Sequence, residues 1–92
     1  MYLFICDAKG GRQYKIVGGW DIVDAVENFH EELCINAGVT HVSGEVFGLM
    51  VKGLIYQDAV KVFNELYPWC KIISIYKNLE EVQLDIIEGE EA

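Results

Sequence analysis

The chain has 92 residues, of which 52% are hydrophobic, and its formal net charge at pH 7 is -8. A chain of this length can build one hydrophobic core, so we expect a single domain over residues 1–87 followed by a frayed acidic tail at 88–92. The acidity argues against direct binding to nucleic acid or to an anionic membrane, because both require clustered Lys and Arg.

The cysteine pattern and the distribution of apolar residues predict a cytoplasmic protein. Cys6, Cys34 and Cys70 have neither the even count of a disulfide framework nor the paired short spacing of a zinc site. No segment has the features of a signal peptide, and no apolar stretch approaches the ~20 residues that span a bilayer. We therefore expect no metal, no cofactor and no membrane association.

The first 19 residues predict a β-hairpin. Residues 2–6, with the sequence YLFIC, form a continuous apolar run that is typical of a central strand covered on both faces. Gly10 and Gly11 supply the positive φ angles that a tight turn requires. Tyr14 and Ile16 then alternate with polar residues, which indicates a second strand with one face in water.

Residues 21–37 predict the longest helix of the chain. Its apolar residues recur at steps of three and four, which places them on one side of an α-helix. They are Ile22, Val26, Phe29, Leu33 and Ala37. Asp21 is suited to cap the first turn, and Gly38 is suited to end the last one.

The rest of the chain predicts further strands and a second helix. Residues 39–51 contain β-branched residues and two glycines, and we expect either one bent strand or a hairpin that turns at Ser43-Gly44. Residues 56–67 predict a helix that Pro68 ends. Residues 71–76 and 82–86 predict the last two strands. The order β-β-α-β(β)-α-β-β indicates an α+β two-layer sandwich, with two helices on one face of a mostly antiparallel sheet of five or six strands.

The sequence contains little that predicts catalysis. His30 and Cys34 lie four residues apart on one helical face, so a base and nucleophile pair is geometrically allowed. However, no glycine-rich segment beside Cys34 indicates an oxyanion hole, and we favour a packing role. We expect a protein that is not an enzyme.

Asp7 is a second candidate for chemistry, because it follows the most apolar strand and a carboxylate there can hold Mg²⁺ for phosphoryl transfer. The position resembles that of an aspartate in small ferredoxin-like nucleases of the CRISPR adaptation type. Such nucleases would need basic helices to hold a duplex, and residues 21–37 contain no Lys or Arg. We therefore interpret Asp7 as a turn residue and keep the metal-dependent enzyme as an alternative.

Acidic residues on the first predicted helix are the strongest candidates for a binding site. Asp24, Glu27, Glu31 and Glu32 lie away from its apolar side, at spacings comparable to those of backbone phosphates. A second acidic group follows near the C-terminus, at Glu80, Glu81, Asp85, Glu88, Glu90 and Glu91. If the two groups meet, their surface imitates nucleic acid. The hypothesis is a non-catalytic protein that binds a basic, nucleic-acid-binding protein, and small acidic anti-CRISPR inhibitors are similar in size and charge. The alternative is that the charge only maintains solubility.

The high apolar content predicts an exposed apolar patch and self-association as a homodimer or larger oligomer. Aromatic residues dominate interface energetics, so the predicted anchors are Trp20, Phe47, Tyr67 and Trp69. A self-assembling structural domain is therefore an alternative function.

Overall fold

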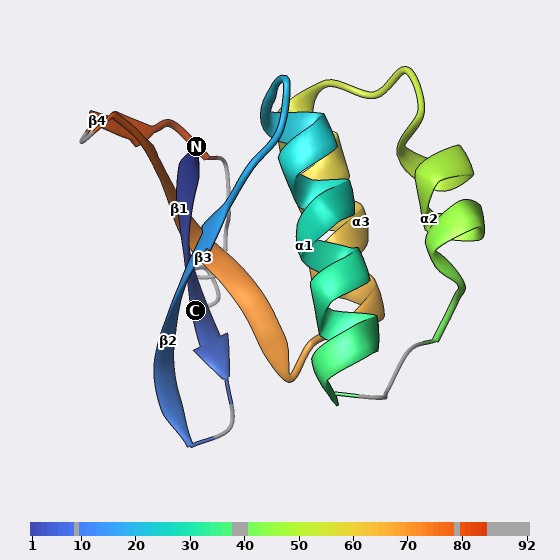
Figure 1. Cartoon of the computed structure of the whole chain (residues 1–92), viewed down its shortest axis with the longest axis horizontal. Coiled ribbons are helices and arrows are strands. Elements are labelled where there is room, and N and C mark those ends of the chain that lie inside the picture. Colours follow the sequence, from blue (N-terminus) through green and yellow to red (C-terminus); the bar gives the residue numbers. More distant parts are fainter. Residues whose placement is uncertain (9, 38–40, 79, 85–92) are drawn as a thin grey trace.

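The computed structural model describes residues 1–8, 10–37, 41–78 and 80–84, apart from the side chains of residues 34–37. These residues form one four-stranded antiparallel sheet and three helices, which confirms the predicted α+β class (Figure 1). The elements in chain order are β1 (Tyr2–Ala8), β2 (Gly11–Val17), α1 (Ile22–Ala37), α2 (Gly44–Val51), α3 (Tyr56–Leu66), β3 (Cys70–Lys77) and β4 (Glu80–Val82).

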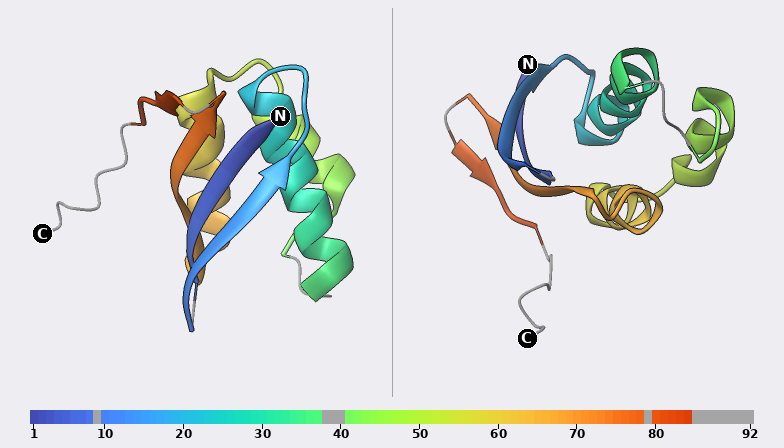
Figure 2. Two further views of the ribbon diagram at one scale, coloured as in Figure 1. Left: turned by 60° about the vertical axis from the view of Figure 1, so that its left-hand side comes forward. Right: turned by 90° about the horizontal axis from the view of Figure 1, so that it is seen from below.

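The helices all lie on one side of the sheet. α1 and α3 pack next to each other, α1 beside β2 and α3 beside β3, whereas α2 packs on α1 and α3 from the side away from the sheet (Figures 1 and 2). The strand order is β2-β1-β3-β4, so β1 is an internal strand as predicted. Positive φ angles at Gly10 (101°) and Gly11 (125°) confirm the predicted turn between β1 and β2.

The core lies between the sheet and the first helical layer. Tyr2, Phe4 and Cys6 of β1 point towards the helices and are buried. The ring of Phe29 on α1 links the two layers, because its centroid lies 5.2 Å from that of Phe4 and 5.3 Å from that of Phe63 on α3. Aromatic pairs at these separations add about 0.5–1.5 kcal/mol each beyond their area burial. Phe29 therefore contacts both the sheet and α3 within one core.

The opposite face of the sheet corrects one prediction. The apolar run of β1 indicated cover on both faces, but every described helix lies on the same side (Figure 2). Leu3 and Ile5 are half-buried, and their neighbours Tyr14 and Ile16 on β2 are 64% and 65% exposed. An apolar sheet surface therefore faces outward.

Residues 44–51 correct a second prediction, because they form helix α2 and not a strand. Ser43 has an extended backbone, and its hydroxyl accepts a hydrogen bond from the Val46 N–H at 3.2 Å, which caps the first turn. Phe47 and Val51, four residues apart, are both 0% exposed and face α1 and α3. Burial of this pair against a preformed helical layer overrides the weak strand preference of the segment.

The C-terminal half otherwise follows the prediction, with fewer strands. α3 ends at Leu66, before Pro68, and Asn64 ties it to β3 because its side-chain amide exchanges two hydrogen bonds with the backbone of Ile72. β4 spans only Glu80–Val82 and pairs with β3. The predicted end of this strand and the acidic tail lie outside the described residues. The sheet therefore has four described strands, where five or six were expected.

Close packing of the segment before α1 yields a stability prediction. A Cβ on Gly19 would lie 2.6 Å from the backbone nitrogen of Ala25, whereas a Cβ on Gly18 would meet nothing nearer than Met1 Sδ at 3.8 Å. Because a helix backbone cannot move aside easily, we expect Gly19→Ala to cost about 1–3 kcal/mol in the free energy of unfolding. Gly18→Ala is the matched control and should cost much less. Urea titration measures both, and equal stability of the two variants would contradict the packing described here.

Candidate protein-interaction surface

The acidic start of α1 is built by helix capping. Asp21 Oδ1 accepts a hydrogen bond from the Asp24 N–H at 2.9 Å, and Asp24 Oδ2 accepts one from the Trp20 N–H at 2.9 Å. The first bond confirms the predicted cap, because it satisfies an N–H group of the first turn that the helix leaves unpaired, and the second ties the preceding residue to that turn. Asp24 therefore stabilises the start of α1, and its charge also adds to the negative potential at this end of the helix.

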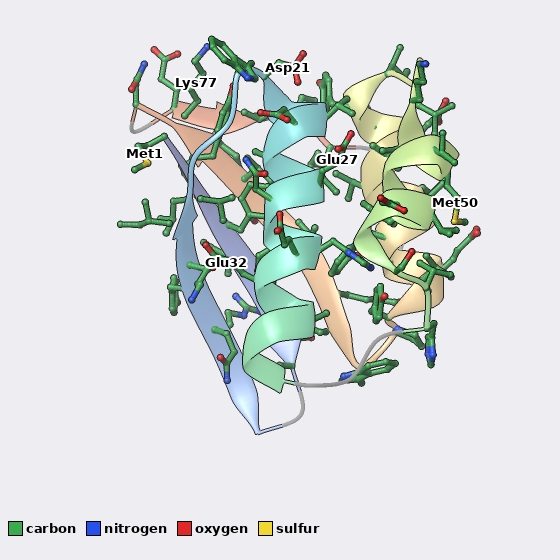
Figure 3. All side chains as sticks on the ribbon, turned by 45° about the vertical axis from the view of Figure 1, so that its right-hand side comes forward. Met1, Asp21, Glu27, Glu32, Met50 and Lys77 are labelled. Atoms are coloured by element: carbon green, nitrogen blue, oxygen red, sulfur yellow. The ribbon has the colours of Figure 1, made fainter. Side chains whose placement is uncertain are left out.

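Glu27 lies one turn further along α1 and faces α2 (Figure 3). A Cβ on Gly48 would lie 3.4 Å from Glu27 Oε1, so the missing side chain of Gly48 leaves room for the carboxylate. Glu27, Gly48, Glu45, Leu49 and Lys52 line a hollow of about 450 Å³ between the two helices. Burial raises the pKa of Glu27, and the nearby carboxylates of Asp24 and Asp21 raise it further. Glu27 thus carries its charge in an unfavourable environment.

Glu31 and Glu32 differ in their surroundings. Glu31 is exposed. Glu32 lies on the sheet side of α1, where its Oε1 is 3.2 Å from Lys15 Nζ on β2. Of the four predicted partner-binding residues, the structure therefore aligns Asp24, Glu27 and Glu31 along one stripe and directs Glu32 to an ion pair within the chain.

The outer side of α2 is apolar, which the sequence analysis missed. Val46, Leu49 and Met50 are 44%, 72% and 41% exposed, and their spacing places them on one face, opposite to buried Phe47 and Val51. A helix that is apolar on both sides is normally buried on both sides. The apolar composition of residues 46–51 is visible in the sequence. It indicates an exposed apolar side only when the segment is known to be a helix, because the helix places Val46, Leu49 and Met50 together.

We name the combined surface the helical face. It consists of Asp24, Glu27 and Glu31 of α1 and Glu45, Val46, Leu49 and Met50 of α2. Met50 marks its outer edge in Figure 3. The helical face is an apolar stripe bordered by carboxylates. Lys52 is the one basic residue among the described residues that line the hollow between the helices.

The residues predicted for self-association do not form one patch. Phe47 and Tyr67 are 0% exposed and belong to the core, so they cannot contact a second copy. Trp20 and Trp69 are 94% and 38% exposed. Trp20 precedes α1 and Trp69 follows α3, and because these helices run in the same direction the two residues lie at opposite ends of the helical layer (Figure 1).

The two acidic groups also stay apart among the described residues. Glu80 and Glu81 belong to β4, at one edge of the sheet, whereas α1 packs beside β2 at the other edge. Asp85, Glu88, Glu90 and Glu91 lie outside the described residues. Among the described residues, the acidic group on α1 therefore does not join the one near the C-terminus into a single surface, as the nucleic-acid-mimic hypothesis required.

His30 is a core residue. It is 0% exposed, its Nε2 is joined by a hydrogen bond of 2.6 Å to the Tyr67 hydroxyl, and its ring stacks on Phe47 at a centroid distance of 4.3 Å. Burial lowers the pKa of His30, which favours the neutral ring. The side chain of Cys34 lies outside the described part of the structure.

Asp7 lies on the open face of the sheet, where it pairs across the strands with Arg12 and with Lys71. Within residues 1–8, 10–37, 41–78 and 80–84, no group of three or more His, Cys, Asp or Glu side chains is arranged to hold a metal ion.

Cys6 and Cys70 form a thiol pair that the odd cysteine count did not reveal. They lie on neighbouring strands, on the side facing α1, and line a cavity of about 230 Å³ with Phe29 and Leu33. The hydrogen bond with the Cys6 thiol lowers the pKa of Cys70 to about 7, and the same bond raises the pKa of Cys6. Cys70 is only 9% exposed.

Comparisons with protein-family models, with curated proteins and with solved structures give no match. Among the described residues, no helix is long and apolar enough to cross a membrane. The function of the candidate site is therefore inferred from its geometry and charge.

The environment of Glu27 yields a pH-dependent prediction. Because its pKa is raised in the folded state, the folded protein is disfavoured while Glu27 is ionised, and this effect disappears as the pH falls through that pKa towards the unfolded value. We expect Glu27→Gln to stabilise the protein at neutral pH by up to about 0.5 kcal/mol, the scale of surface substitutions. The gain should vanish in acid. Urea titrations of both proteins at a series of pH values test this, and a constant or inverted difference would refute it.

Proposed function

We propose that this is a non-catalytic interaction protein whose helical face binds a basic partner protein. The observation that carries the proposal is the outer side of α2, where Val46, Leu49 and Met50 are exposed beside the carboxylates of Glu27 and Glu45. A contiguous apolar stripe with a charged border is typical of protein interfaces, in which apolar anchors supply affinity and border charges supply orientation.

The charge of the helical face specifies the chemistry of the partner. Asp24, Glu27 and Glu31 project from a helix that contains no Lys or Arg. Such a field attracts Lys and Arg and increases the association rate with a basic surface. The raised pKa of Glu27 supports this interpretation, because an opposite charge on a partner would relieve its repulsion from Asp24 and Asp21.

The partner therefore carries basic side chains together with apolar ones. A groove or helix of a nucleic-acid-binding protein has such a composition, because its Lys and Arg are arranged to meet phosphates. In this form of the proposal the helical face competes with nucleic acid for the partner, and the protein is an inhibitor.

Charge reversal on the helical face tests the proposal. The double variant Glu27→Lys/Glu31→Lys should retain the fold and lose capture of basic proteins from a host lysate, with at least about a tenfold loss of affinity for any purified partner. Asp58→Lys/Glu65→Lys is the matched control, since it makes the same change of charge at two exposed positions of α3. Mass spectrometry of the eluates at low and high salt identifies the partner.

Two further results decide the outcome. Leu49→Lys should also reduce capture, because it places a charge in the middle of the apolar stripe. Binding that survives the reversal at Glu27 and Glu31, or that is lost equally in the α3 control, would show that the total charge and not the helical face determines binding.

A further inference from the structure

The side of the sheet that no described helix covers is a second apolar surface, on the opposite side of the molecule from the helical face (Figure 1). Residues directly opposite each other in an antiparallel pair point to the same face. The register therefore places Leu3 and Ile5 of β1 beside Ile16 and Tyr14 of β2 and beside Tyr76 and Ser74 of β3. We name this surface the sheet face.

The centre of the sheet face is suited to receive apolar side chains. Leu3, Ile5, Ile16 and Tyr76 line a shallow hollow of about 520 Å³ together with Met1. Strands with continuous apolar sequence are normally covered on both faces, because each face otherwise leaves branched side chains in water. β1 has this sequence, yet the described helices cover only one of its faces.

Charges on the sheet face cancel, unlike those of the whole chain. Asp7, Arg12 and Lys71 lie at one end, and Glu81 lies beside Tyr76 at the other end. Among the described residues, the face thus carries two acidic and two basic residues, whereas the formal net charge of the chain is -8. Two copies of so acidic a protein repel each other, and they do so least where their facing surfaces are neutral.

We propose that the sheet face binds a second copy of this chain, forming a two-fold symmetric dimer in which two sheets pack face to face. A two-fold interface uses the same patch on both subunits, so the patch must be complementary to itself. The sheet face meets this condition at its apolar centre. A basic partner, in contrast, finds no excess of negative charge there.

The distribution of charge also selects an orientation. In this dimer the two-fold axis lies midway between the two sheets and is perpendicular to their strands. The two copies of β1 then run antiparallel to each other. Each Lys71 then lies near Glu81 of the second copy, because these residues occupy opposite ends of neighbouring strands. The arrangement forms two equivalent ion pairs around the apolar centre.

Sedimentation equilibrium over a range of micromolar concentrations tests the dimer. The wild-type mass should rise from 10.4 kDa to twice that value. Ile16→Lys should stay monomeric, because it puts a charge into the apolar centre at a position that is 65% exposed and therefore tolerates the change. Tyr14→Lys, at 64% exposure, should behave in the same way and guards against a folding defect in either variant.

Leu49→Lys is the matched control, because Leu49 is 72% exposed but lies on the helical face. It should dimerise like the wild type. A wild-type mass that stays monomeric throughout would overturn the proposal, as would a dimer that is lost in Leu49→Lys and kept in Ile16→Lys. The first result would leave the function proposed for the helical face intact, whereas the second would assign self-association to the helical face itself.

A charge exchange tests the orientation. Lys71→Glu and Glu81→Lys should each weaken dimerisation about tenfold, because each places like charges together at two symmetric contacts. The double variant Lys71→Glu/Glu81→Lys should recover the wild-type dissociation constant. Failure of the double variant to recover would overturn the antiparallel arrangement.

Salt separates the two surfaces. Added salt should change the dissociation constant of the dimer little, because it screens both the repulsion between two negative chains and the two Lys71–Glu81 ion pairs, whereas it should weaken capture of a basic partner. A dimer that dissociates with salt as steeply as the complex with a basic partner would contradict assembly through the neutral sheet face.

Discussion

The hydrogen bond between His30 and Tyr67 is the interaction on which the arrangement of the helices depends. His30 lies in the middle of α1, Tyr67 directly follows α3, and their side chains meet at 2.6 Å inside the core. The Tyr67 hydroxyl also accepts a hydrogen bond from the backbone N–H of His41 at 3.3 Å, on the segment that leads to α2. A buried polar group is costly unless it is paired, so this network specifies one packing of three segments. Phe47 of α2 stacks on the His30 ring and completes it.

Fixing α2 in this way creates a molecule with two different outer surfaces. Phe47 and Val51 occupy the inner side of α2, which forces Val46 and Leu49 outward beside the carboxylates of α1. The described helices cover one side of the sheet, and the described residues of its other side are largely apolar and balanced in charge. A chain this short buries a smaller fraction of its surface than a larger domain does. The apolar surface that the core cannot accommodate is thus divided between a face suited to a basic partner and a face suited to a second copy.

The elements with a clear periodicity were predictable from the sequence. α1, α3, β3 and the β1–β2 hairpin follow from local patterns, because the period of apolar residues and the capping or turn residues at their ends agree with each other. α2 was not predictable in the same way. Its β-branched residues and glycines favour a strand locally, and only the cap at Ser43 and the burial of Phe47 and Val51 decide for a helix. The acidic half of the helical face was predicted from α1, whereas its apolar half depended on α2 and was missed.

The sequence by itself determined the α+β class, the long acidic helix, the internal position of β1 and the presence of more apolar surface than one small core can bury. The tertiary structure alone decided which apolar residues are buried. Trp20 and Tyr67 are both aromatic residues beside a helix, yet Trp20 is 94% exposed and Tyr67 is 0% exposed, because only Tyr67 lies where three segments converge. The same holds for charge, since Glu27 and Glu32 lie on the same helix, yet Glu27 faces α2 and Glu32 forms an ion pair with Lys15. Local periodicity assigns a residue to one side of a helix or strand, but what covers that side is a property of the assembled fold.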